Sequence, residues 1–141
     1  MIILVSEKSR LEYKKINNRI IIDDSFNSNY KGFVEALNIL KDSNGKRFLL
    51  TPGIVELGKY KKEIYEALVD NILLSTDVVI LIGYFQTRIL YSLLKDTNLE
   101  VYVLHNFKEA YDFFLELSKK YDECSLLIEN DIPDLYRIGL I

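Results

Sequence analysis

Runs of isoleucine, leucine and valine, each about the length of one strand, recur along this chain and constrain its fold more than any other feature. They lie at Arg19–Asp23, Arg47–Thr51, Val78–Gly83, Glu100–Leu104 and Ser125–Glu129. Apolar runs without alternating polar residues indicate strands buried on both faces, which is typical of parallel sheets. Parallel strands need long crossover connections, usually helices.

The segments between these runs have the apolar spacing of amphipathic helices. In the first segment Phe33, Val34, Leu37 and Leu40 share one helical face, and in the second Ile64, Leu68 and Ile72 do so. The third segment, Thr87–Leu94, is short. In the fourth, the apolar residues are Phe107, Ala110, Phe113, Phe114 and Leu117. Asn106 and Glu109 resemble a capping box before the last helix. The alternation predicts the α/β class, with a mainly parallel sheet of about six strands.

One stretch departs from the alternation. Arg10–Asp23 contains two strand-like pieces around Ile16-Asn17-Asn18, which predicts a hairpin with one antiparallel edge strand. Met1–Lys8 fits either an extra strand or the remnant of an upstream segment. The chain has 141 residues, which suits one domain.

Charge and hydropathy exclude several partners. The net charge is −3 and no basic stripe is present, so we expect no nucleic acid partner. The longest apolar run, Val78–Phe85, is too short to cross a bilayer, and the first residues lack the pattern of a signal peptide. Cys124 is the single cysteine, so no disulfide forms within the chain. We expect a soluble, cytoplasmic domain without membrane partners.

The polar residues that follow the first apolar run have two interpretations. Ligands of open α/β sheets bind beyond the carboxyl ends of the strands. There a carboxylate can accept hydrogen bonds from ribose hydroxyls, and the first N–H groups of a helix can bind an anion. Alternatively, Asp24, Asn27 or Asn29 forms an Asx-turn and a helix N-cap. The bare sequence leaves both open.

Two other features do not support a catalytic or phosphate site. Gly53–Tyr60 has the glycine and lysine spacing of a P-loop but ends in Tyr60, and its β-branched residues and Pro52 are unsuited to a phosphate cradle. His105 is the single histidine, and a strand-end or helix-cap role is favoured over catalysis. No cluster of Cys or His residues has metal-ligand spacing.

Several segments together resemble one family. They are SRLEYKK, IIDDSFNSN, GFVEALNIL, TPGIVELG, VILIG and IENDIPD, in that order, from Ser9 to about Tyr136. They are similar to the C-terminal domain of Mur ligases, most of all to the MurF type, which adds D-alanyl-D-alanine to a peptidoglycan precursor. The resemblance implies a Rossmann-like, three-layer α/β/α lid domain over residues 10–141, with residues 1–9 as a leading segment or linker remnant.

The resemblance also implies a function that depends on other domains. In such ligases the lid closes over ATP, while a central domain carries the phosphate loop and Mg²⁺ and an N-terminal domain holds the UDP-MurNAc-peptide. We therefore expect these two domains as partners, in cis or in trans, and an isolated chain that is inactive. The alternative is a non-catalytic module, derived from a ligase lid, that binds a small ligand or a protein.

Individual residues match the motifs of the family. Arg10, Asp24 and Asn27 correspond to positions near the nucleotide. Ser28, Asn29 and Asn130 correspond to positions near the substrates, D-Ala-D-Ala among them. Gly53, Glu56 and Gly58 match a motif whose glycines look structural, and Tyr30 stands where the family often has Pro. The resemblance places no catalytic residue and no metal ligand on this chain.

Overall fold

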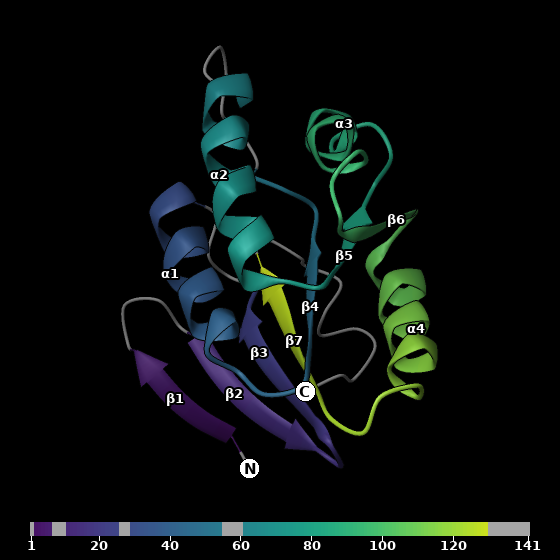
Figure 1. Ribbon diagram of the computed structural model, residues 1–141. Helices are drawn as coiled ribbons and strands as arrows, with labels where there is room; N and C mark the ends of the chain where they lie inside the picture. The colour runs from purple at the N-terminus through teal and green to yellow at the C-terminus, as the bar shows by residue number, and fades with distance from the viewer. Residues whose placement is uncertain (1, 7–10, 26–28, 55–60, 130–141) are drawn as a thin grey trace.

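Seven strands form a single mixed sheet in a computed structural model that describes residues 2–6, 11–25, 29–54 and 61–129 (Figure 1). The strand order is β1-β2-β3-β7-β4-β5-β6, which makes β1 and β6 the two edges. The strands are β1 (Ile2–Ser6), β2 (Leu11–Ile16), β3 (Arg19–Asp24), β4 (Lys46–Thr51), β5 (Val78–Ile82), β6 (Glu100–Leu104) and β7 (Cys124–Glu129).

Strand direction confirms the predicted fold class. The strands from β3 through β7, β4 and β5 to β6 are all parallel, whereas β2 pairs antiparallel with both β1 and β3. Among the described strands, β2 is thus the one that runs against the others. The sheet has one strand more than the six expected because Ile2–Ser6 forms β1.

The predicted hairpin joins β2 to β3. Ile16 pairs with Arg19, and the two asparagines between them make the turn. Asn17 has φ 57°, a left-handed conformation that asparagine tolerates better than most residues and that two-residue hairpin turns need. This local chemistry is the reason that the hairpin could be predicted from the sequence.

Helices cover both faces of the sheet and give three layers (Figure 1). α1 (Tyr30–Lys41), α2 (Lys61–Ser75) and α3 (Arg88–Leu94) pack on one face, and α4 (Phe107–Ser118) packs on the other. Successive residues of β4 show the alternation, because Leu49 lies in the α1–α3 core while Phe48 and Leu50 lie in the α4 core. Cys124 is buried in the α4 core, and burial raises the pKa of its thiol.

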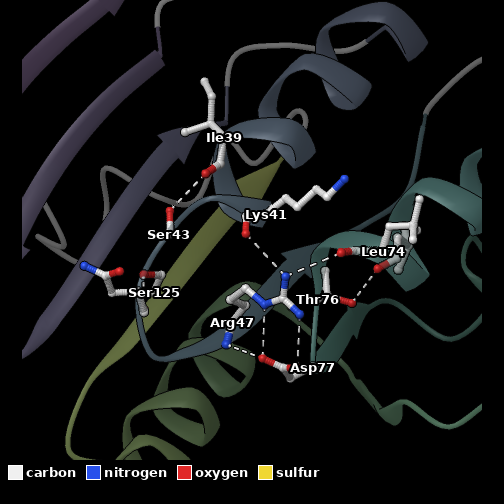
Figure 2. Close-up of polar contacts among 10 residues, drawn as sticks. Ile39, Lys41, Ser43, Arg47, Leu74, Thr76, Asp77 and Ser125 are labelled. Atoms are coloured by element: carbon white, nitrogen blue, oxygen red, sulfur yellow. Dashed lines mark hydrogen bonds and ion pairs between the residues drawn. The ribbon is translucent and has the colours of Figure 1, made fainter.

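Arg47 ties elements together at the amino end of β4 (Figure 2). Its guanidinium binds the Asp77 carboxylate through Nε at 3.2 Å and Nη2 at 3.3 Å. Nη1 donates to the Lys41 and Leu74 carbonyls, both at 3.4 Å. These carbonyls belong to the last turns of α1 and α2, where a cation is favourable because helix C-termini carry partial negative charge. These contacts join the ends of α1 and α2 to β4, which lies between β7 and β5 in the sheet.

The described helices do not resemble membrane spans. None of them combines the length and the apolar character that a bilayer crossing requires.

Candidate functional site at the carboxyl edge

The parallel strands β3, β7, β4, β5 and β6 end along one side of the sheet, where open α/β sheets bind ligands. We call the described residues that follow or end these strands the carboxyl edge; they are 23–25, 29, 51–54, 83–87, 105–106 and 129. Their contacts show which of the predicted roles the geometry supports.

Two side chains at the start of this edge stabilise local backbone. Asp23 Oδ1 accepts a hydrogen bond from the Ser25 N–H at 3.0 Å, which forms an Asx-turn. Asn29 Oδ1 accepts from the Gly32 N–H at 2.7 Å and caps α1. The predicted N-cap is thus confirmed at Asn29, whereas the Asx-turn is formed by Asp23, which was not among the residues predicted for it. A substrate contact by Asn29 stays a prediction, with its oxygen already engaged in the cap.

Asp24 and Glu129 lie side by side at the ends of β3 and β7, in direct register. Only 1% of Asp24 and 0% of Glu129 is exposed. Ile22 and Leu127, two positions earlier, belong to the α1–α3 core. Because strand side chains alternate between faces, both carboxyl groups point to that same side of the sheet. The fold therefore brings together two buried acids from segments about a hundred residues apart in sequence.

Burial raises the pKa of Glu129 well above its ordinary value, and Asp24 and then Asp23 raise it further. Within the described residues, no N–H or O–H of another group donates to the Glu129 oxygens. Burial and the neighbouring aspartates therefore favour the protonated form of Glu129 in the folded chain.

The ribose contact predicted for Asp24 requires a carboxylate that is open at the rim of the sheet. Asp24 is buried in this chain, beside Glu129, and its contact with a ribose stays a prediction. The predicted residues Arg10, Asn27, Ser28 and Asn130 lie outside the described residues, as do Glu56 and Gly58.

A buried tyrosine organises the loop after β4. Tyr65 Oη, from α2, accepts from the Ile54 N–H at 2.9 Å and donates to the Ile54 carbonyl at 3.2 Å. Thr51 Oγ1 accepts from the Gly53 N–H at 3.0 Å. Gly53 has φ 87°, and a Cβ there would lie 2.5 Å from Tyr65 Oη, so only glycine fits. These two N–H groups are engaged internally, which agrees with the rejection of a P-loop here.

The loop after β5 presents aromatic rings to solvent. Gly83 has φ 87°, and its carbonyl accepts a hydrogen bond from Thr87 Oγ1 at 2.5 Å. Tyr84 and Phe85 are 61% and 74% exposed. The His105 ring faces Tyr84 with 6.4 Å between ring centroids. The strand-end position predicted for His105 is confirmed, since it directly follows β6.

Asn106 caps α4 by accepting from the Glu109 N–H at 2.9 Å. This bond confirms the capping residue predicted from the sequence.

Sequence reasoning missed Glu129 and Tyr65 as organising residues. Glu129 lies in a segment that the strand pattern placed at this edge, but its partner Asp24 becomes a neighbour only when β7 inserts beside β3. Tyr65 follows the core residue Ile64 in an amphipathic helix, and nothing local indicates that its hydroxyl binds the loop before it.

Comparison with known proteins supports a fold-level relationship. No protein-family model matches the chain, and neither does any curated protein. Among solved structures, MurF from Acinetobacter baumannii aligns with a TM-score of 0.74 and 21% identity over 87% of this chain and 27% of that one. MurF from Thermotoga maritima in complex with ADP gives 0.65 and 16% identity over 88% and 27%.

A shorter structure aligns over almost its whole length. It is a domain of a Haemophilus ducreyi protein named as a UDP-N-acetylmuramate:L-alanyl-gamma-D-glutamyl-medo-diaminopimelate ligase, with a TM-score of 0.58 and 18% identity over 86% of this chain and 88% of that domain.

The three layers and the sheet order define a Rossmann-like α/β/α domain. More particularly, the domain has the fold found in MurF and other Mur ligases, so the resemblance predicted from the sequence is confirmed for the fold. The chain spans about a quarter of the length of the MurF proteins that it matches.

Proposed function

We propose that this chain acts as the C-terminal lid domain of an ADP-forming, MurF-type peptidoglycan-precursor ligase. The observation that carries the proposal is the extent of the structural match, which takes in 87% of this chain and only 27% of MurF from Acinetobacter baumannii. An N-terminal and a central ligase domain, in cis or in trans, are then its partners. UDP-MurNAc-peptide and D-Ala-D-Ala are then the substrates of the complete enzyme, and we expect it to act in the cytoplasm.

The described residues do not fit ATP by themselves. The Asp24 carboxyl group is buried, and the Gly53 and Ile54 N–H groups are engaged within the chain. ATP supplies the phosphoryl group that activates a carboxylate, and Mg²⁺ belongs to the central domain. This chain contributes Arg10, Asp24 and Asn27 on the nucleotide side and Ser28, Asn29 and Asn130 on the amine side.

A lid exchange tests this proposal. The C-terminal domain of a MurF enzyme is replaced by this chain, and ADP release is measured with and without D-Ala-D-Ala. We expect ligation that depends on D-Ala-D-Ala, and a lower rate at limiting ATP in an Asp24→Asn chimera. A soluble chimera with a cooperative melt and no more activity than the lidless enzyme would contradict the lid function. An Asp24→Asn chimera with an unchanged KM for ATP would remove Asp24 from the nucleotide site.

Titration of the isolated chain gives a second test. Because part of the nucleotide site lies on other domains, isothermal titration with a non-hydrolysable ATP analogue should show binding no tighter than micromolar. Sub-micromolar binding would show a complete site on this chain alone.

The buried position of Asp24 favours a second candidate, a non-catalytic module derived from a ligase lid. Native mass measurement on the protein from its source cell separates the two functions. A complex with a protein or domain that carries a P-loop supports the ligase, whereas a chain found alone or only with its own copies supports the module.

A further inference from the structure

The outer side of β6 is an open sheet edge. β6 ends the sheet, and no described strand pairs with its outer side. Its residues Val101–Leu104 are partly exposed and contain no charge, proline or glycine. Free N–H and C=O groups on such an edge pair readily with another strand, so proteins commonly cover an edge, charge it or interrupt it with a bulge. Val101–Leu104 contains no charged residue that would protect the edge from such pairing.

One backbone hydrogen bond fixes which backbone groups of β6 face outward. The Gly83 N–H donates to the Leu104 carbonyl at 2.8 Å, so Leu104 faces β5. In a parallel ladder, the N–H and C=O of one residue point to the same side, and the side alternates along the strand. Tyr102 therefore also faces β5, while Val101 and Val103 direct their N–H and C=O groups away from the sheet.

A groove of about 490 Å³ follows the same edge; it is lined by Tyr84, Thr87, Arg88, Tyr91, Val101, Tyr102 and Val103. The Val101 and Val103 side chains pack on the α1–α3 face. Several polar groups of the groove have partners within the chain: Thr87 donates to the Gly83 carbonyl, and Arg88 donates to the Phe85 carbonyl at 2.7 Å. Val101, Val103 and the aromatic rings line the rest. The Arg88 guanidinium also lies 3.9 Å from the Phe85 ring centroid. The groove is therefore suited to apolar side chains.

We propose that β6 pairs with β6 of a second copy of this chain, antiparallel and centred on Tyr102, so that the two sheets become continuous. Val101 of each copy then exchanges two backbone hydrogen bonds with Val103 of the other. The valine side chains of the second copy lie on the α1–α3 face, where the groove receives them. Tyr102 lies directly opposite Tyr102 of the second copy, in a closely spaced pair on the other face.

The charge of Glu100 favours this orientation. Glu100 lies at the amino end of β6, on the α4 face with Tyr102, because side chains alternate along the strand. Antiparallel pairing places the two Glu100 carboxylates at opposite ends of the paired strands. Parallel pairing would place the two Glu100 carboxylates together. The contact is two-fold symmetric, as in most homodimers.

The central Tyr102 pair gives a test that is specific for the register. Sedimentation velocity should show a monomer–dimer equilibrium in the wild type with a dissociation constant on the order of 100 µM, as expected of a small interface. Tyr102→Lys and Tyr102→Glu should each weaken the dimer at least about tenfold, because like charges then lie directly opposite. An equimolar mixture of the two variants should restore a mixed dimer.

Two control variants keep the test informative. Tyr102→Phe keeps the packing on Phe113, whose ring centroid lies 4.7 Å away, and should retain the dimer. Leu74→Lys changes an exposed apolar side chain on α2, outside β6 and its groove, and should have no effect. A wild type that stays monomeric to about 1 mM overturns the proposal. The proposal is also overturned if both charged variants dimerise as well as the wild type. It is overturned as well if the mixture of Tyr102→Lys and Tyr102→Glu stays monomeric.

Discussion

At the scale of single residues, the Asp24–Glu129 pair makes the stability of the fold depend on pH. The folded pKa of Glu129 lies well above the unfolded one, so the folded chain keeps a proton that the unfolded chain has lost. Stability is then fully present below the ordinary glutamate pKa and decreases as pH rises toward the folded pKa, by up to about 1.4 kcal/mol per pH unit. Glu129→Gln carries no charge to bury, so its stability should not show this decrease.

Urea unfolding from about pH 4 to pH 9 measures the effect. Glu116→Gln is the matched control, because Glu116 is exposed and pairs with Lys119 at 3.0 Å. We expect the Glu116→Gln profile to follow the wild type. Parallel profiles for wild type and Glu129→Gln would show that the buried pair does not hold an extra proton.

The Tyr65 hydroxyl provides a second prediction at this scale. Tyr65→Phe leaves the N–H and C=O of Ile54 without the hydroxyl that binds both, while the ring stays in the core. The expected loss is about 1–3 kcal/mol of unfolding free energy, measured by urea denaturation. Tyr111→Phe on α4 removes a hydroxyl from another buried tyrosine and serves as the control. Equal stability of the Tyr65→Phe variant and the wild type would mean that water replaces the hydroxyl.

At the scale of elements, Arg47 connects β4 to the ends of α1 and α2. Arg47→Lys keeps the charge but loses the planar fork that binds Asp77 at two oxygens. We expect a loss of about 1–2 kcal/mol at neutral pH by urea denaturation. Arg88→Lys is a matched substitution at an exposed arginine and should change stability little. A similar loss in both variants would show that Arg47 has no special role.

Asp77 adds a pH dependence to the same prediction. Burial alone would raise the pKa of Asp77, but the hydrogen bonds and charge of Arg47 outweigh it, so the pKa lies below its ordinary value. The stability from this pair is present above the ordinary aspartate pKa and is lost as pH falls through the lowered pKa. The difference between wild type and Arg47→Lys should therefore shrink in acid.

The sequence could specify most elements but not how distant ones meet. The apolar runs predicted β3 to β7 to within about a residue at each end, because strands buried on both faces leave a strong local signal. The asparagine turn likewise specified the hairpin. The burial of Asp24 could not be predicted, since it depends on β7, which enters the sheet beside β3 from the far end of the chain. A strand-end carboxylate has the same local pattern whether it faces solvent or a second acid.

At the scale of the whole molecule, the sheet has two unequal edges. On one side the sheet ends in β2, which is antiparallel to its neighbours, and β1; on the other side no strand of the described part of the chain pairs with the outer edge of β6. Hydrogen exchange followed by NMR reads this asymmetry residue by residue. In dilute protein, the Tyr102 and Leu104 amides should exchange slowly because they face β5, whereas the Val101 and Val103 amides should exchange fast because they face outward.

The same measurement at high concentration separates edge pairing from a general gain in stability. Pairing of β6 with a second copy slows exchange at Val101 and Val103 and leaves the Tyr102 and Leu104 amides unchanged, because only the outward N–H groups find new acceptors. The Tyr102→Lys variant should keep fast exchange at both valines at every concentration. Slow exchange of Val101 and Val103 in dilute wild type would show that the outer edge of β6 is already covered within a single chain.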